Sequence, residues 1–387
     1  MAPEVAVYTT PPEGLVELLR RSHPLLALPL VRRLQFATRI PGGITEHARI
    51  LWCSGAPLQD HRLLAVYKKH DDDDGEVGVE LRKGEEEEEG EEGTEGSSSS
   101  TGRKHVPFAA AYLDFSRGPE TELWIYSSME GRLDGTWGSE KGTGAGREEE
   151  GREGASNDGD NDDWEREEEI ACAVALLREV KRLQDLYFVP GSPQAREREF
   201  PSILVGNLHE VLRERLVAPE VGMAIVSTGL YDKWVFEVGQ LPDVGLPEVL
   251  GDDGRRWVWD VVRREDIAFT ISRTQIPRRE RTMKLLPSTA LYLDDGTPIA
   301  WAFLGPDSSL SSLHCEEPYR GRGIAKALAA KVLREHLTDY SDDACYGWAD
   351  VAPDNIQSQG VCRSLKGQAR WQISWSRLNL DQSFPDE

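Results

Sequence analysis

The chain has 387 residues and a formal net charge of −23 at pH 7. A chain of this length can bury one large hydrophobic core or two ordinary ones. The charge at first suggests a mimic of nucleic acid, but residues 71–100 alone carry a net −12 and residues 146–169 a net −9. Only −2 is left for the rest of the chain, so the part that folds is almost neutral and no nucleic-acid partner is predicted.

The two acidic segments are of low complexity, and we expect them to be inserts at 70–104 and 130–169. Their composition cannot bury enough apolar surface to offset the entropy of ordering the chain. They are therefore expected to be disordered. Such inserts are either solvated loops without a binding role or an acidic tether for a basic protein partner, and the sequence leaves both interpretations open.

The five Cys show no Cys-x-x-Cys spacing and no metal-binding pattern with the eight His. We therefore expect reduced thiols and no metal site. No stretch approaches 18 apolar residues, which predicts no membrane span. The apolar run 23–31 lacks the cleavage site of a signal peptide and is interpreted as a core helix. A cytoplasmic protein is expected, with the nucleus as the alternative.

The N-terminal part predicts strands followed by helices. Apolar residues recur at every third position over Ile170–Leu186, which is typical of a helix. A strand at Ser202–Val205 and a helix at Leu208–Leu216 follow. The runs that predict strands before them are Ala48–Cys53, Arg62–Lys68, Val106–Phe115 and Glu122–Ser127.

The C-terminal part begins with Ser288–Leu304, where Asp295-Gly296 predicts a hairpin turn between two strands. Ser308–Cys315 predicts a third strand, which ends at a turn rich in Arg and Gly. The apolar face that follows, with Leu328, Val332 and Leu333, predicts a long helix. A strand at Cys345–Val351 and a short helix toward Leu365 complete the order. Leu230–Phe236 and Arg255–Val262, between the two parts, are interpreted as buried strands or helix ends.

The Arg- and Gly-rich turn indicates a phosphate site. Its glycines allow the backbone to approach a ligand closely, and the helix after it offers free N–H groups and the positive end of its dipole. Its arginines add full positive charges. The residues of this turn are Arg320, Gly321, Arg322, Gly323, Ile324 and Ala325.

This hexapeptide matches the pattern Gln/Arg-x-x-Gly-x-Gly/Ala, the pyrophosphate-binding turn of the GNAT superfamily of acyl-CoA-dependent N-acyltransferases. The order of elements around it also resembles the GNAT core, most of all the C-terminal half of the glycine N-acyltransferase-like group. The resemblance implies an α/β (α+β) fold with a mixed, mostly antiparallel sheet flanked by helices. It also implies acetyl-CoA or another acyl-CoA as co-substrate.

The N-terminal part, without its inserts, resembles the same core but lacks the pyrophosphate turn between Ser127 and Ile170. We therefore expect two GNAT-like halves, of which only the second keeps the coenzyme site; a single elaborated domain is the alternative. The expected domains are a degenerate half at 1–235, a connecting segment at 236–284 and the acyl-CoA-binding domain at 285–380.

The resemblance implies roles for residues at the end of the third strand. Backbone N–H groups from Leu313 to Cys315 would polarise the thioester carbonyl. His314 or Glu316 would act as the general base, with Glu317 as a further option. His314 has the unperturbed pKa best suited to pH 7. Many GNAT enzymes carry a Tyr as general acid seven residues after a particular Asn, and here that position holds Cys362.

That Asn is Asn355, and with Ser358 it would lie near the pantetheine arm; simple capping of the next helix is an equal alternative. Arg278 and Arg279, near the expected acceptor entrance, would bind the carboxylate of an amino-acid acceptor or form a solvated basic turn. The expected activity is acyl transfer to a small amine or amino acid by direct attack in a ternary complex. A non-catalytic CoA-binding or protein-interaction module and a protein acetyltransferase are the alternatives.

Overall fold

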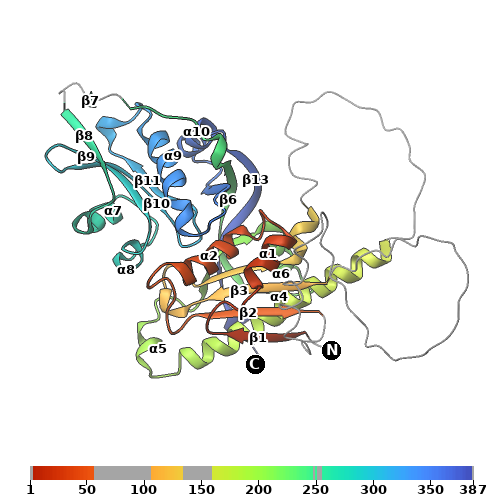
Figure 1. Cartoon of the computed structure of the whole chain (residues 1–387). Coiled ribbons are helices and arrows are strands. Elements are labelled where there is room, and N and C mark those ends of the chain that lie inside the picture. Colours follow the sequence, from red (N-terminus) through yellow and green to blue (C-terminus); the bar gives the residue numbers. More distant parts are fainter. Residues whose placement is uncertain (1–2, 56–105, 134–158, 247–248, 251–254, 386–387) are drawn as a thin grey trace, which may run out of the picture.

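The computed structural model describes residues 3–55, 106–133, 159–246, 249–250 and 255–385 (Figure 1). The predicted strand Arg62–Lys68 and the first acidic insert lie outside these residues, as does most of the second insert. The two ends of the second insert are helical, in a 3-10 helix at Ser128–Leu133 and in α4, Gly159–Tyr187. The prediction that 130–169 cannot order itself is therefore wrong at its ends, because Glu favours helix and the apolar face that follows Ile170 supports the added turns.

The described strands form two sheets. In spatial order the first contains β1 (Glu4–Tyr8), β2 (Arg49–Ser54), β3 (Phe108–Leu113), β4 (Leu123–Ser127), β5 (Ile203–His209), β13 (Gln368–Leu378), β6 (Ile225–Glu237) and β12 (Tyr346–Val351). The second contains β11 (Leu310–Cys315), β10 (Pro298–Leu304), β9 (Ser288–Leu293), β8 (Arg255–Asp260) and β7 (Val249–Leu250). Apart from β4 and β5, which are parallel, neighbouring strands are antiparallel.

Helices cover both sheets (Figure 1). The first sheet has α1 (Leu15–Ser22) and α2 (Leu28–Arg39) on one face and α4 with α6 (Glu210–Val217) on the other. Two short helices, α5 (Pro193–Glu197) and α11 (Leu380–Ser383), lie near it. The helices of the second part are α7 (Ile267–Ser272), α8 (Glu280–Met283), α9 (Ile324–His336) and α10 (Ile356–Ser364).

The same order of elements occurs twice along the chain. The first half runs β1, α1, α2, β2, β3, β4, α4, β5, α6, β6, and the second runs β8, α7, α8, β9, β10, β11, α9, β12, α10, β13. The predicted fold class, two GNAT-like α/β halves with mostly antiparallel sheets flanked by helices, is confirmed. Residues 236–284, expected to connect the halves, contain β8, which pairs with β9 inside the second sheet.

The two halves exchange their last strands. Strand β6, which ends the first half, pairs with β12 of the second half, and β13, which ends the second half, pairs with β5 of the first. The two exchanged strands also pair with each other. Neither half can therefore complete its sheet alone.

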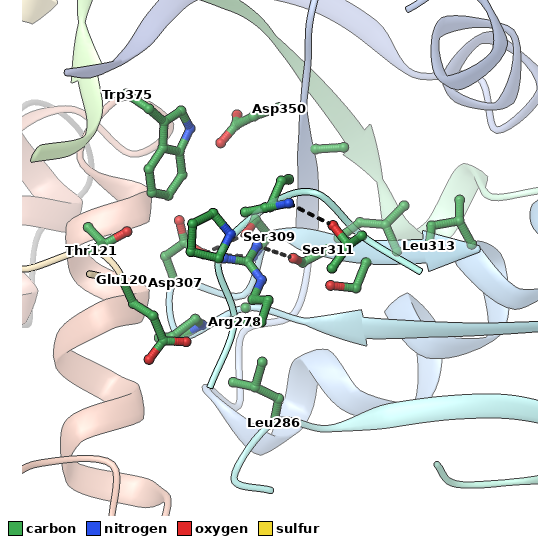
Figure 2. Close-up of a pocket in the computed structure, with 18 of the residues that line it drawn as sticks. Glu120, Thr121, Arg278, Leu286, Asp307, Ser309, Ser311, Leu313, Asp350 and Trp375 are labelled. Carbon is green, nitrogen blue, oxygen red and sulfur yellow. Dashed lines mark hydrogen bonds between the residues drawn. The ribbon is translucent and has the colours of Figure 1, made fainter. Parts of the chain in front are cut away.

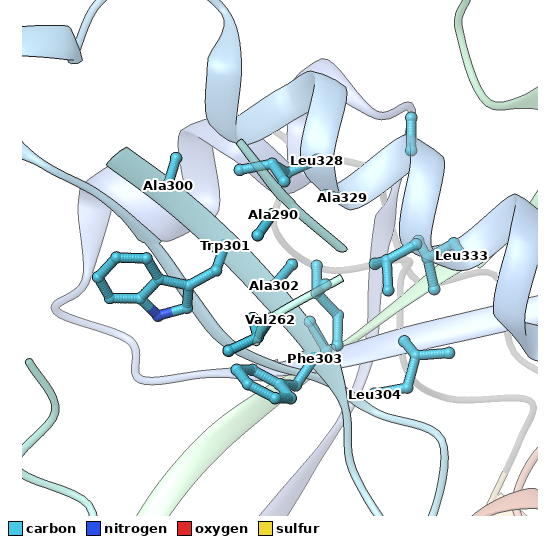
Figure 3. Close-up of a cluster of buried hydrophobic side chains, with 14 of the residues drawn as sticks. Val262, Ala290, Ala300, Trp301, Ala302, Phe303, Leu304, Leu328, Ala329 and Leu333 are labelled. Carbon is cyan, nitrogen blue, oxygen red and sulfur yellow. The ribbon is translucent and has the colours of Figure 1, made fainter. Parts of the chain in front are cut away.

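The core of the second half illustrates this dependence. Figure 3 shows Trp301 and Phe303 of β10 together with Leu328 and Leu333 of α9, all of which are buried. The same cluster includes Phe236, a residue of β6 that the first half contributes. Burial of such side chains supplies most of the driving force for folding, so the exchange binds the halves into one hydrophobic unit.

Candidate active site

The predicted phosphate turn lies between β11 and α9. Gly321 and Gly323 have φ angles of 76° and 80°, in the left-handed region that favours glycine. Among the described residues, and apart from the two chain neighbours of each glycine, no heavy atom lies within 4 Å of the place where its Cβ would stand. The turn is therefore open, and Arg320 holds it to the strand through a hydrogen bond of 2.9 Å from its Nε to the carbonyl oxygen of Cys315.

Helix α9 points its N-terminus at this turn. Gly323 is its N-cap residue, and no side chain caps the helix there. The first N–H groups of a helix have no partner within the helix, so those beginning at Ile324 are available to a ligand. The Ile324 side chain is buried and anchors the helix, whereas Gly321, Arg322 and Gly323 are exposed. The first four of the six predicted coenzyme residues, Arg320 to Gly323, thus form an exposed, positively charged turn suited to a pyrophosphate.

A pocket of about 740 Å³ opens beside this turn, where β11 and β12 separate. The two strands are joined by a single parallel bridge, Ser309 to Trp348. Beyond the bridge β11 contains a bulge, and Ser312, with a φ angle of 50°, and Leu313 have no register partner in β10. The predicted site residues that line the pocket are Leu313, His314, Asn355, Ser358 and Cys362.

The first half also contributes to this pocket. Its lining residues include Arg33 of α2, Trp124 of β4 and Glu120, which precedes β4. The phosphate turn, Cys315 and Glu316 do not line it, so the pocket lies next to the predicted coenzyme turn rather than over it. Its walls therefore come from both halves, in a position suited to the reactive end of a coenzyme and an acceptor.

The imidazole of His314 is partly buried, in surroundings that favour its neutral form. Its ring stacks on Trp301 with centroids 4.6 Å apart. Its Nε2 is buried, lies 3.4 Å from Glu316 Oε1 and has no hydrogen-bond partner in the described residues. Burial lowers the pKa of His314, against the smaller opposing effect of Glu316. The imidazole is therefore a weaker base than an exposed one.

The other two predicted catalytic side chains are also constrained. Glu316 Oε1 accepts a hydrogen bond of 2.8 Å from Arg273 Nε, so its charge is partly neutralised. Cys362 lies in the pocket wall on α10, and burial raises the pKa of its thiol to about 12. Such a thiol keeps its proton firmly and is a poor acid for a leaving thiolate.

Asn355 acts as a helix cap. Its Oδ1 accepts a hydrogen bond of 3.0 Å from the backbone N–H of Ser358, at the start of α10. This is the geometry of an N-cap, and Asn355 also lines the pocket.

The two arginines before α8 have different environments. Arg279 is exposed, as a solvated basic turn predicts. Arg278 lines the pocket, donates a hydrogen bond of 3.0 Å to Ser311 Oγ and has a shielded Nε (Figure 2). Burial lowers the pKa of Arg278, against the smaller opposing effects of Glu120 and Asp307. The solvated interpretation is therefore wrong for Arg278, because its guanidinium is buried in the pocket wall.

Several charged residues of the site were not foreseen from the sequence, among them Asp307, Asp350 and Lys233. Asp307, in the β10–β11 turn, and Asp350, on β12, line the pocket (Figure 2). Lys233 of β6 stands opposite Asp350 in the strand register, and its Nζ lies 2.5 Å from Asp350 Oδ1. A signal was present, since Lys233 and Asp350 are charged residues inside runs that predict buried strands.

In the first half, the segment between β4 and α4 takes the place that the phosphate turn has in the second half, and it carries buried acidic residues. Glu130, after β4, is buried and accepts a hydrogen bond of 3.0 Å from the backbone N–H of Ser127. Glu169 of α4 is also buried and accepts one of 3.1 Å from Ser128 Oγ. Burial raises the pKa of Glu130 well above its usual range. These carboxyl groups occupy the region where the second half presents Arg and Gly.

Within the described residues, no cluster of three or more His, Cys, Asp or Glu side chains has an arrangement that would hold a metal ion. None of the described helices is long and apolar enough to cross a membrane.

The fold and the site define a GNAT-type acyl-CoA acyltransferase, and comparison with known proteins supports this class. Residues 258–366 match the acetyltransferase (GNAT) family, and residues 2–234 match the N-terminal domain of the acyl-CoA N-acyltransferase verG. Because the second match covers more than half of the chain, the chain belongs to this acyl-CoA N-acyltransferase family. Acyl-CoA is therefore the co-substrate class that the family implies.

Solved structures of low sequence identity are similar to this chain. A Drosophila protein is 12% identical and has a TM-score of 0.53, over 97% of this chain and 98% of its own. A tandem GNAT protein from the clavulanic acid biosynthesis pathway is 9% identical with a TM-score of 0.42, over the same shares. A GCN5-related N-acetyltransferase from Kribbella flavida is 15% identical with a TM-score of 0.36, over 54% of this chain and 76% of its own. No curated protein sequence matches the chain significantly.

Proposed function

We propose that this protein transfers an acyl group from acyl-CoA to a primary amine by direct attack within a ternary complex. The observation that carries the proposal is the junction of an open, cationic phosphate turn with a pocket where β11 and β12 separate. The turn would hold the pyrophosphate, and the thioester would lie along β11. The bulge at Ser312 and Leu313 presents backbone without a register partner, which suits polarisation of the carbonyl.

Finer features of this function are proposals as well. We take acetyl-CoA as the acyl donor and kinship to the glycine N-acyltransferase-like group as predictions from the sequence resemblance. A contact between Arg278 and a carboxylate of the acceptor is supported by its place in the pocket wall. The cytoplasmic or nuclear location and a basic protein partner for the acidic inserts stay predictions.

The first test is calorimetric titration of acetyl-CoA into the wild type and into Gly323→Glu. The substitution forces an L-residue into a left-handed conformation and adds a negative charge where the pyrophosphate would lie. A like charge about 4 Å away costs roughly 1–4 kcal/mol near a protein surface, so affinity should fall at least about fivefold.

The matched control is Gly360→Glu, on exposed α10, where, apart from its own helix and its chain neighbours, no heavy atom of the described residues lies within 4 Å of the added Cβ. This variant should bind acetyl-CoA like the wild type. Equal loss of affinity in both variants would attribute the effect to charge in general rather than to the turn. Absence of heat from the wild type with acetyl-, butyryl- and benzoyl-CoA would refute the proposed enzyme and favour a non-catalytic module.

A further inference from the structure

Asp350 occupies the point where the pocket meets the separated strands. The bridge between Ser309 and Trp348 sets a parallel register, and continuing this register by two residues on each strand brings Ser311 level with Asp350. Two residues beyond Ser311 on β11 is Leu313, beside which the thioester carbonyl is expected to lie. Figure 2 shows Asp350 on the side of the pocket opposite Asp307 and Ser311.

The carboxylate of Asp350 is poorly satisfied by the protein. Its side chain is only 8% exposed. Lys233 Nζ lies 2.5 Å from Oδ1 and is its counter-charge. Oδ2 has no hydrogen-bond partner in the described residues, so it is available to a polar ligand in the pocket.

A second buried carboxylate, that of Asp307, lines the same pocket. Asp307 is 2% exposed, and its Oδ1 accepts hydrogen bonds from the backbone N–H and Oγ of Ser309, at 3.1 and 2.7 Å. Its Oδ2 is buried and has no partner in the described residues. Lys233 and Asp307 are the charges that act directly on Asp350. Asp307 in turn interacts electrostatically with Arg33 and Arg278, and Lys233 interacts electrostatically with His209 of β5.

We propose that Asp350 binds the acceptor's ammonium group and takes the proton that this amine must lose before it attacks the thioester, an inference that rests on the proposed function. Asp307 Oδ2 supplies a second contact for the ammonium. The neutral amine then forms the C–N bond, the C–S bond breaks, and the remaining surplus proton passes from nitrogen to the departing CoA thiolate.

The surroundings of Asp350 suit the role of general base better than those of the three catalytic residues that the sequence predicted. His314 is kept neutral and stacked, Glu316 is paired with Arg273, and Cys362 holds its proton tightly. Burial raises the pKa of Asp350, while Lys233 opposes this effect and keeps the group ionisable. A carboxylate with a raised pKa is a better general base than an exposed one.

The test compares Asp350→Asn with Asp354→Asn, an exposed Asp four residues further along the chain. Both variants are titrated with acetyl-CoA and assayed for thiol release with benzylamine, phenethylamine, glycine and phenylalanine from pH 5 to 9. Asp350→Asn should keep the wild-type affinity for acetyl-CoA but lose about 10²–10⁴-fold in kcat/KM. The fall in kcat/KM on the acidic side of the pH profile should also disappear, whereas Asp354→Asn should match the wild type.

A third variant, Lys233→Met, tests the counter-charge. Removing the cation raises the pKa of Asp350, so the acidic fall in kcat/KM should move to higher pH. A retained acidic fall in Asp350→Asn, or a loss of activity matched by a loss of acetyl-CoA affinity, would overturn the proposal in favour of a structural role.

If acetyl-CoA binds but no amine of the panel is acylated, a binding measurement tests the proposed ammonium site instead. The same amines are then titrated into the CoA-saturated protein. Amine binding that Asp350→Asn abolishes and Asp354→Asn retains supports the ammonium site. Equal binding in both variants, or no binding to the wild type, refutes it. Failure of acetyl-CoA itself to bind would refute the proposed function and would be seen before any amine is added.

Discussion

Replacing Phe236 by Ala would test whether the exchanged strands make the two halves one folding unit. Phe236 belongs to β6 of the first half, yet its side chain is fully buried in the core of the second half. A Cβ built on Gly367 would stand 2.4 Å from its ring, which shows how closely the chain encloses it. Removing a fully buried Phe ring costs about 3–5 kcal/mol, a large part of the roughly 5–15 kcal/mol that stabilises a typical domain.

The assay is urea unfolding followed by far-ultraviolet circular dichroism and tryptophan fluorescence. We expect one transition by both probes, shifted to lower urea in Phe236→Ala by the same amount for each. The control Val226→Ala lies on the same strand with a side chain 53% exposed, and it should change stability by less than about 0.5 kcal/mol. Two separate transitions, of which the substitution moves only one, would show that the halves fold independently and would refute the reasoning.

Two further predictions concern titration and helix capping. Burial raises the pKa of Glu122 from 4.5 to about 7, so its contribution to stability is fully present below pH 4.5 and is lost as pH rises toward 7. Glu122→Gln should therefore gain stability relative to the wild type between pH 5 and pH 8, by up to about 3 kcal/mol in urea unfolding; a constant difference would contradict the assignment. Asn355→Ala should cost about 1 kcal/mol through loss of the cap on α10, and Asn355→Asp should restore it. If Asn355 only caps the helix, Asn355→Asp binds acetyl-CoA like the wild type in calorimetry, whereas a direct coenzyme contact would weaken binding in this variant.

Local signals were enough to predict the elements around the coenzyme turn. The Asp295-Gly296 hairpin, the strand that ends at Cys315 and the apolar face of α9 are all encoded within short stretches of sequence. The left-handed conformations of Gly321 and Gly323 fit the glycines of the predicted turn. The prediction of two halves also succeeded, because each half repeats the same order of strands and helices.

Long-range pairing was beyond the sequence pattern. Both β6 and β13 have the composition of ordinary strands, and nothing in either run specifies that each pairs with the opposite half. The charged residues Asp307, Asp350 and Lys233 were not predicted for the same reason, since their proximity also depends on long-range contacts. An Asp or Arg is normally solvated, and only the assembled halves bury Asp307 and bring Asp350 against Lys233.

The exchange of strands also constrains the order in which the chain can fold during synthesis. The first half ends its own sequence with β6, but its sheet also requires β13, which begins at Gln368. At a ribosomal rate of 5–20 residues per second, the interval between these two strands lasts on the order of ten seconds. During that time the edge of β5 that β13 will cover lacks its final partner, and an uncovered strand edge of this kind is open to pairing with another chain.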